Sequence, residues 1–372
     1  MPTSILGRKI KETLCFRTGR KSQKEEYDRK RHSHGIIDAA SLSCKCIQHF
    51  RCFAQVPQPL DLLRRAMQYR ISVRKPSVTV RVPATTANLG PGFDTLGIAL
   101  KLHNQVSIRE TDALTVERID GQKGSASANA MAKEAVDAFF RRSKGKPHGL
   151  QIEVKGDVPV SSGLGSSVTV RLGIVFALNE LNDRPLGDTE LLDLVTELEH
   201  HPDNAAPALF GGFVVSALIN GSVRYRRFNV PPALKFVVCV PEYEVSTEKA
   251  RALLPKMVPL RDAVENLNRV ALIISIFAAG DYSLLRGLFD DKLHQPYRKK
   301  LIPMLDDVIA GGVEAGALAG WLSGSGASIM CLTEQKERAV AEAMANVFAK
   351  QQIRCETHIL IADNDGTRVK RA

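Results

Sequence analysis

Apolar and polar positions alternate with two periods along the chain, and together they predict a mixed α+β protein. Runs rich in β-branched residues, typical of strands, occur at residues 77–82, 150–154 and 235–240. Apolar residues three or four positions apart, typical of helices, occur at residues 126–141 and 188–199. Further strands are expected at residues 98–101, 105–109 and 356–361, and further helices at residues 170–181, 247–254, 260–280 and 336–350.

The positive charge of the chain is concentrated at its N-terminal end. The 372 residues carry a net charge of +11, of which +9 lies in residues 1–70, so the remainder is nearly neutral. A basic protein often binds nucleic acid. Because the body of this chain is nearly neutral, no nucleic-acid partner is expected for it. Residues 1–70 show little periodicity and are expected to be a disordered extension. They are interpreted either as a targeting leader or as an over-long upstream reading frame with Met67 as the natural start, and both remain open.

The cysteines and the hydropathy pattern indicate the cellular compartment of the protein. The seven cysteines have no regular spacing, which argues against a disulfide framework and for a reducing, cytoplasmic environment. The histidines and cysteines between residues 32 and 49 match no standard zinc finger. No apolar run reaches about 18 residues, so no membrane partner is expected.

A glycine-bearing loop joins the strand predicted at residues 150–154 to the helix predicted at residues 170–181. Two glycines allow the backbone to approach a ligand closely, and the serines are candidate helix caps. The free N–H groups and the dipole at a helix start favour an anion, usually phosphate. A plain helix cap is the other interpretation of this loop, which consists of Pro159, Val160, Ser161, Ser162, Gly163, Leu164, Gly165, Ser166, Ser167, Val168 and Thr169.

A second loop, at residues 84–97, carries Asn88 and Asp94 among three glycines and a proline. An amide and a carboxylate on one structured loop suit the ammonium and hydroxyl groups of a small polar ligand. The alternative is that both residues form turns by bonding their own backbone. Further along, Glu199, Asp203 and Asn204 suit a hard cation such as magnesium, which binds one or two carboxylates and phosphate oxygens.

A third loop, at residues 319–330, contains small residues that would leave room for a bound group. With it, the chain resembles the GHMP small-molecule kinases, and within them the homoserine kinase group. Residues 159–167 are similar to the family's phosphate loop, and residues 87–94 to the Ala-Asn-Leu-Gly-x-Gly-Phe-Asp signature of that group. Residues 201–208 and 323–328 resemble two further family motifs.

The resemblance implies the two-domain GHMP kinase fold of the α+β class. A left-handed βαβ domain that binds ATP is expected at residues 76–230, and a ferredoxin-like domain at residues 231–372. The implied activity is ATP-dependent phosphorylation of L-homoserine in threonine biosynthesis, with ATP and Mg2+ as cofactors. A homodimer is the assembly that the family suggests. Another GHMP kinase, acting on mevalonate or a sugar, and a non-catalytic ligand sensor of the same fold are the alternatives.

The resemblance also implies roles for particular residues. Glu199 and Ser167 (or Ser166) would hold the metal, and Asn129 would lie near the adenine of ATP. Asp94 would bind the substrate ammonium, and two arginines its carboxylate. The full set expected to hold homoserine is Asn88, Asp94, His201, Asn204, Thr247, Arg251 and Arg298.

Two departures from the family pattern affect the expected mechanism. His200 stands where glycine is common, next to the expected metal ligand Glu199. Asn204 stands where many GHMP kinases carry an aspartate base. Glu199 and Asn204 are therefore the expected catalytic residues, in a mechanism without a strong protein base. Electrostatic stabilisation and alignment would supply the rate enhancement.

Overall fold

The computed structural model describes residues 76–112, 115–116 and 126–370. The extension predicted at residues 1–70 lies outside the described residues. Among the described helices, none is long and apolar enough to cross a membrane.

The first sheet has seven strands, and its order is β11-β1-β2-β4-β3, with β5 paired to β2 and β6 paired to β5. β3 and β4 pair in parallel, and helix α3 (Ala126–Ser143) lies between them in the sequence, which forms the expected βαβ unit. The strands are β1 (Ser77–Ala87), β2 (Leu96–Thr111), β3 (Thr115–Val116), β4 (Gly149–Gly156), β5 (Phe213–Ile219), β6 (Ser222–Phe228) and β11 (Arg368–Val369).

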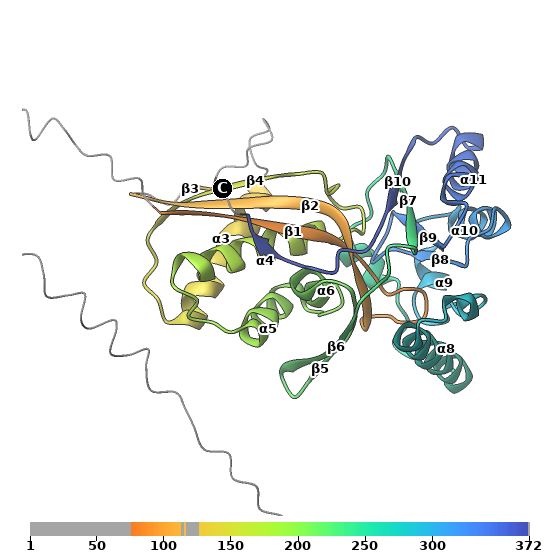
Figure 1. Cartoon of the computed structure of the whole chain (residues 1–372), viewed down its shortest axis with the longest axis horizontal. Helices are drawn as coiled ribbons and strands as arrows, with labels where there is room; N and C mark the ends of the chain where they lie inside the picture. Colours follow the sequence, from red (N-terminus) through yellow and green to blue (C-terminus); the bar gives the residue numbers. More distant parts are fainter. Residues whose placement is uncertain (1–75, 113–114, 117–125, 371–372) are drawn as a thin grey trace, which may run out of the picture. The chain divides into compact units, whose positions relative to one another are not determined.

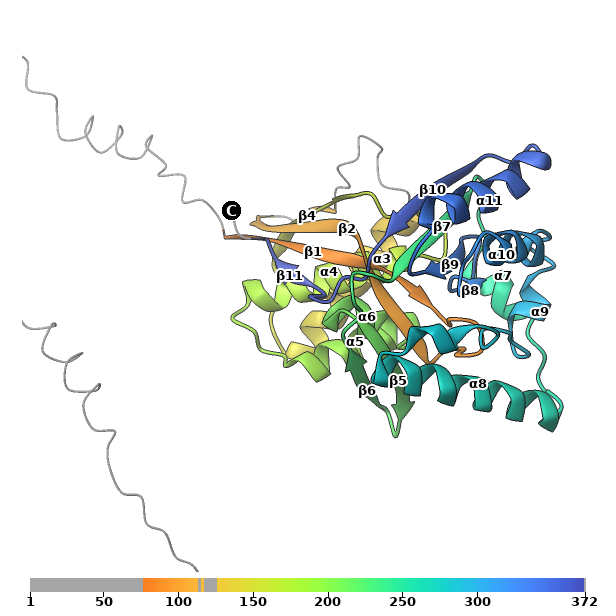
Figure 2. The same cartoon turned by 45° about the vertical axis from the view of Figure 1, so that its right-hand side comes forward.

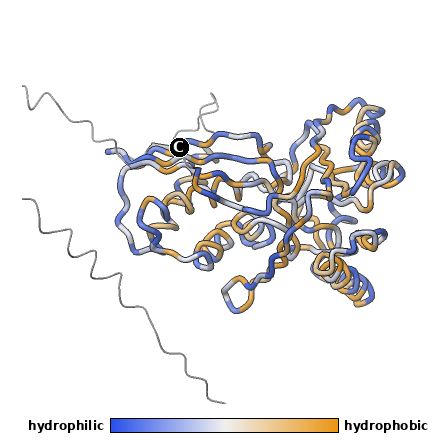
Figure 3. Tube along the Cα trace, in the orientation of Figure 1, coloured by the Kyte–Doolittle hydropathy of each residue, from blue (hydrophilic) through white to orange (hydrophobic). Residues whose placement is uncertain are grey.

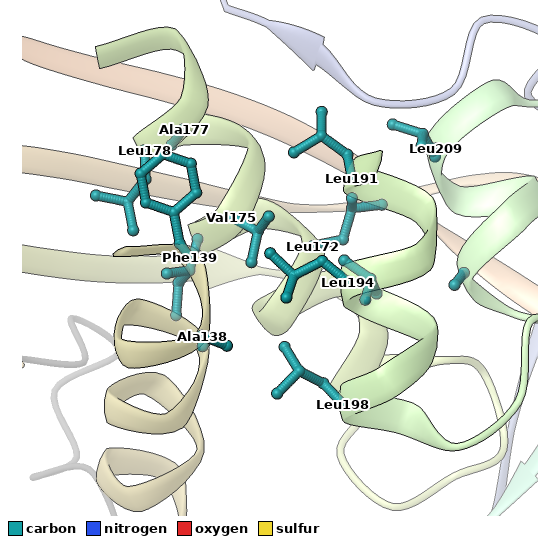
Figure 4. Close-up of a cluster of buried hydrophobic side chains, with 14 of the residues drawn as sticks. Ala138, Phe139, Leu172, Val175, Ala177, Leu178, Leu191, Leu194, Leu198 and Leu209 are labelled. Carbon is teal, nitrogen blue, oxygen red and sulfur yellow. The ribbon is translucent and has the colours of Figure 1, made fainter. Parts of the chain in front are cut away.

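Four helices lie on one face of this sheet (Figure 1): α3, α4 (Ser166–Leu181), α5 (Asp188–Glu199) and α6 (Ala205–Phe210). Figure 4 shows side chains from all four meeting in one apolar cluster that includes Phe139, Leu172 and Leu194. α4 packs against both the sheet and its neighbouring helices, so nine of its residues are buried. This packing fixes the start of α4, where the glycine-bearing loop ends.

The second sheet contains β7 (Lys235–Pro241), β8 (Ala319–Leu322), β9 (Ile329–Thr333) and β10 (Cys355–Leu360) in the order β10-β7-β9-β8, with antiparallel pairing throughout. Helices precede β8 and β10, so the connectivity is the βαββαβ pattern of ferredoxin-like folds. Figure 2 shows α10 and α11 beside this sheet and α8 further along. The helices are α7 (Thr247–Ala252), α8 (Leu260–Ala279), α9 (Gln295–Arg298), α10 (Leu305–Glu314) and α11 (Glu337–Lys350), with a 3-10 turn at Tyr282–Leu285.

A shared core joins the two sheets. Buried side chains of the first sheet, such as Leu96 and Ile98, pack in one cluster with Phe236 and Trp321 of the second. Leu164 of the glycine-bearing loop belongs to the same cluster. Apolar residues recur at intervals along the strands and helices that supply these contacts (Figure 3). This apolar packing thus holds in place the loops at the junction of the two sheets.

The α+β class and the two-domain family fold are confirmed, but two strand predictions are wrong in detail. β1 does not stop at Pro83; it continues to Ala87, and the register shifts between Pro83 and Ala84. An irregularity tolerates proline because no ladder hydrogen bond from its nitrogen is needed there. The strands expected at residues 98–101 and 105–109 form one strand, β2, since the residues between them stay paired with β1.

Short elements were missed because their sequences carry no long period. α6, α10 and the β5–β6 hairpin were not expected. β11 pairs with β1 through Val80–Val369 and Arg81–Arg368, so the last described strand returns to the first sheet. The division of the chain at residues 230 and 231 stays a prediction.

Candidate active site

The three loops singled out in the sequence meet around one cavity of about 880 Å³. Most of the expected site residues line it, although they come from elements far apart in the sequence. They are Asn88, Asp94, Asn129, Val160, Ser161, Ser162, Gly163, Gly165, Ser166, Ser167, Val168, Glu199, His201, Asn204, Thr247, Arg251 and Arg298.

Within the part of the chain that the structure describes, no side chain caps the start of α4. Its N-cap is Gly165, with φ 70° and ψ 27°, so the candidate caps among the loop serines are wrong. Ser162 instead donates a hydrogen bond to Pro159 O (2.9 Å), and Ser167 donates one to Glu199 Oε2 (2.9 Å). The N–H groups of the first turn therefore remain without a side-chain partner, which is the arrangement that binds an anion.

Two glycines allow this loop to lie against its neighbours. Gly163 has φ 82°, and a Cβ added there would lie 2.2 Å from Ser323 O. Gly165 has φ 70°, and its Cβ would lie 2.2 Å from Thr85 Oγ1. Both the backbone conformation and the space exclude a side chain at these positions.

The third loop braces the first two. Ser323 Oγ donates to Gly163 O (2.7 Å), and Ser328 N donates to Ser162 O (2.9 Å). Asn88 Nδ2 donates to Gly324 O (2.9 Å), which ties the second loop to the third. The expected open space for a ligand is provided by Gly324 and Ser325, which line the cavity, while the buried serines hold the loops together.

Asp94 and Arg251 form a two-pronged ion pair at one side of the cavity. The distances from Arg251 Nη2 to Asp94 Oδ1 and from Nη1 to Oδ2 are 2.7 and 3.1 Å, and each side chain is about one third exposed. The N–H of Asp94 donates to Asn88 Oδ1 (3.0 Å). The amide of Asn88 thus shapes the loop that presents Asp94; Asn88 also lines the cavity, and its role in binding homoserine stays a prediction.

Arg298 is buried beside this pair. Its Nη1 donates to Gly324 O (2.9 Å), and Nε has no hydrogen-bond partner among the described residues. The guanidinium groups of Arg298 and Arg251 lie 5.1 and 5.5 Å from the centre of the Phe93 ring. Burial, and then the nearby charge of Arg251, lower the pKa of Arg298 to about 10. Two cations gathered beside one carboxylate suit a ligand that carries a carboxylate as well as an ammonium.

A hydrogen-bonded chain runs behind the cavity from β1 to the end of α5. Thr85 Oγ1 donates to Asn204 Oδ1 (2.7 Å), and Asn204 Nδ2 donates to Asp203 Oδ1 (3.2 Å). The same Asp203 oxygen lies 2.7 Å from His201 Nδ1. Burial opposes charge on both groups, but their attraction and hydrogen bond prevail, so the pKa of His201 is raised and the pKa of Asp203 is lowered. Asn204 is therefore held in one orientation by partners on both sides.

Glu199 is the last residue of α5, and its side chain is 6% exposed. Its Oε2 accepts the hydrogen bond from Ser167, and its Oε1 lies 2.9 Å from Arg171 Nη1. His200, which follows, adopts the left-handed conformation with φ 68°, as the glycine common at this place in the family would. The departure at His200 thus leaves the end of α5 in the conformation that glycine would give.

Some expected residues lie away from the cavity or were missed. Leu164 and Thr169 are fully buried in the core and Pro159 borders a different cavity, so their side chains do not line this one. Asn129 lies exposed on α3, at the cavity. Arg171, which contacts Glu199, was not expected; its position four residues after Ser167 was the signal, because that spacing places both on one helix face.

Comparison with known proteins agrees with this architecture. The family model described as GHMP kinases N terminal domain matches residues 130–212, and the one described as GHMP kinases C terminal matches residues 263–350. The homoserine kinase of Moorella thermoacetica is 42% identical over 78% of this chain and 99% of its own. That of Clostridium beijerinckii is 40% identical over 78% of this chain and 98% of its own.

Solved structures give the same result. A crystal structure of homoserine kinase from Cytophaga hutchinsonii matches with a TM-score of 0.72 and 30% identity, over 79% of this chain and 97% of that one. A putative homoserine kinase from Listeria monocytogenes matches with a TM-score of 0.64 and 27% identity, over 79% and 99% of the two chains. The fold and the glycine-loop cavity therefore define an enzyme of the GHMP kinase class. Within that class, the chain belongs to the homoserine kinase family.

Proposed function

We propose that the enzyme transfers the terminal phosphoryl group of ATP to the side-chain hydroxyl of L-homoserine, which yields O-phospho-L-homoserine for threonine biosynthesis. The observation that carries this proposal is the pairing of two unlike surfaces in one cavity. One is the uncapped helix start in a glycine loop, and the other is Asp94 with Arg251 and Arg298.

The acceptor side fits a zwitterionic amino acid. Asp94 and Arg251 pair with each other, and Arg298 adds a second cation. The ammonium of homoserine takes the place of Arg251 as the partner of Asp94. The carboxylate of homoserine then binds both arginines. His201 and Thr247, which also line the cavity, complete this side. Mevalonate and sugars lack an ammonium group, so they offer Asp94 no cation to take the place of Arg251.

The donor side fits a nucleotide. The N–H groups at the start of α4 bind the phosphates, as helix N-termini do. Gly163 and Gly165 let the loop backbone lie against Ser323 and Thr85, which holds the N–H groups of the loop in place. Asn129 of α3 lies at the same cavity, where the base of the nucleotide would lie.

Ser167 and Glu199 fit the magnesium ion that this class of kinase implies. Both offer oxygen, and Ser167 Oγ lies 2.9 Å from Glu199 Oε2. Magnesium prefers oxygen ligands, and a hydroxyl and a carboxylate oxygen that lie this close together could both hold one ion. Among the described residues, no group of three or more carboxylates, histidines or cysteines is placed to hold a metal, so phosphate oxygens and waters would supply the remaining ligands. When bound, the ion offsets charge on the phosphates.

The chain's residues align the acceptor hydroxyl rather than deprotonate it strongly. The side-chain amide of Asn204 does not titrate, and it is oriented by Thr85 and Asp203. The hydroxyl oxygen bonds to phosphorus as the bond to the ADP oxygen breaks, and its proton passes to the transferred phosphoryl group. The N–H groups of the loop stabilise the charge that this group carries.

A coupled assay of ADP release tests the proposal with L-homoserine, mevalonate and galactose as acceptors. We expect turnover with L-homoserine alone. 4-Hydroxybutyrate, which lacks only the ammonium, is a matched control and should be a poor acceptor because it makes no contact with Asp94. ADP release with mevalonate or galactose but not with L-homoserine would indicate another GHMP kinase, and no turnover with any acceptor would favour a ligand sensor. The homodimer stays a prediction.

A further inference from the structure

Arg171 connects the expected metal ligand to the helix that starts the phosphate loop. It lies on α4, one turn after Ser167, so both side chains project from one face of the helix. Nη1 of Arg171 donates to Glu199 Oε1 (2.9 Å) and to Leu198 O (2.7 Å), and Nη2 donates to Glu134 Oε2 (2.8 Å). The Arg171 side chain is only 17% exposed and lines the cavity.

The two carboxylates beside Arg171 differ in exposure, and therefore in how much an ion pair with Arg171 stabilises each of them. Glu199 is 6% exposed, and a buried carboxylate without a partner is costly. Glu134 is 53% exposed, so water solvates it and its ion pair contributes little. Arg171 is therefore mainly the partner of Glu199, and Glu134 holds its outer edge.

This pairing decides which oxygen of Glu199 is available. Oε1 is held by Arg171, whereas Oε2 is directed toward Ser167. Arg171 contacts Glu199 through Nη1 alone, while its bonds to Leu198 O and Glu134 hold the planar guanidinium in place. With Ser167 on Oε2, each oxygen of Glu199 has its own donor, which fixes the rotation of the carboxylate. Glu199 thus presents one oxygen, next to the hydroxyl of Ser167.

The pairing also decides the local charge. Arg171 offsets the charge of the buried Glu199, and water screens the exposed Glu134, so a divalent cation entering the cavity without nucleotide meets little net negative charge beside Glu199. Nucleotide phosphates would supply that charge once they occupy the loop. We propose that Arg171 is a positioning residue that makes Glu199 a one-oxygen ligand and keeps cation affinity low until nucleotide is bound. This proposal rests on the proposed function of the loop as a nucleotide site.

Direct cation binding tests it without turnover. Mn2+ is titrated into the full chain, with and without a non-hydrolysable ATP analogue, and free Mn2+ is followed by electron paramagnetic resonance. For wild type we expect weak binding alone and, with the analogue, much more bound Mn2+ than the same analogue binds without protein. Arg171→Met should bind Mn2+ about tenfold more tightly than wild type without nucleotide, because Glu199 is then unpaired. Its kcat should fall at least tenfold while its KM for L-homoserine stays within about twofold.

Two further variants separate charge from geometry. Arg171→Lys keeps the charge but not the planar fork, so it should restore the weak Mn2+ affinity of wild type and only part of kcat. Glu134→Gln removes the outer partner alone and should match wild type in both measurements. Far-ultraviolet circular dichroism and urea unfolding confirm that each variant is folded.

The outcomes that contradict the proposal are distinct. An Arg171→Met protein that is folded and binds Mn2+ as weakly as wild type would show that Arg171 only braces α4 against α5. An Arg171→Lys protein with full kcat would show that the fork is not needed for positioning. Wild-type protein that binds no Mn2+ even with the ATP analogue would overturn the assignment of the loop itself.

Discussion

The two sides of the cavity present different groups to a ligand: the donor side presents backbone, and the acceptor side presents charged side chains. The donor side is a loop of small residues whose backbone is fixed by contacts such as those of Gly163 with Ser323. The acceptor side presents long charged side chains, Asp94, Arg251 and Arg298, that partly satisfy one another. Phosphates are common to many nucleotides and are bound well by N–H groups, whereas a particular amino acid must be recognised by side chains that match its charges.

This difference predicts how each side responds to mutation. A change on the donor side disturbs backbone packing, so it should lower both stability and turnover. A change on the acceptor side removes one side chain without moving the backbone, so it should alter mainly the affinity for the acceptor.

The largest effect is expected for Gly163→Ala. The new Cβ would meet Ser323 O at 2.2 Å in a left-handed conformation, so the loop must shift. We expect roughly a 100-fold loss of kcat and a loss of about 2–4 kcal/mol in the free energy of unfolding. Gly221→Ala is the matched control: its φ is 79°, but no atom lies within 4 Å of the added Cβ. It should lose about 1 kcal/mol and no activity. Equal activity of the two variants would contradict the rigid-loop account.

Asp94→Ala should have the next largest effect. It removes the carboxylate that binds the substrate ammonium, and a hydrogen bond to a charged group contributes about 1.5–3 kcal/mol. The KM for L-homoserine should rise about 100-fold while the KM for ATP stays within about twofold, as measured by ADP release. Asp290→Ala, at an exposed aspartate whose side chain is 75% accessible, is the control. If the KM for ATP rose as much as that for homoserine, the two sides would not be independent.

The smallest effect concerns pH. The pKa of His201 in the folded protein is above its ordinary value of 6.5, because the attraction of Asp203 outweighs the effect of burial. The folded state thus binds this proton more tightly than the unfolded chain does. The resulting stabilisation is complete below about pH 6.5 and is lost as the pH rises through the raised pKa.

Wild type should therefore lose stability relative to His201→Asn as the pH rises above neutrality. Urea unfolding of both proteins over a series of pH values measures the difference. A difference that does not change across this range would show that the folded protein does not bind the His201 proton more tightly.

Much of the fold followed from local pattern. The helices expected at residues 188–199 and 260–280 are α5 and α8, because their apolar residues repeat with the helical period. The strand expected at residues 235–240 is β7. α6, with six residues, carries too short a pattern to be recognised, and the length of β2 depends on its pairing with β1.

The sequence alone determined the family and the three loops, because glycines, prolines and small polar residues at fixed spacing are local requirements of those backbones. It also indicated Asp94, Glu199 and Asn204 as site residues. Only the tertiary structure decided how these groups are paired. Asp94 bonds Arg251 across 157 positions, and Glu199 bonds Arg171 across 28. Such contacts depend on how the elements pack, and no periodicity along the chain records which charges that packing brings together.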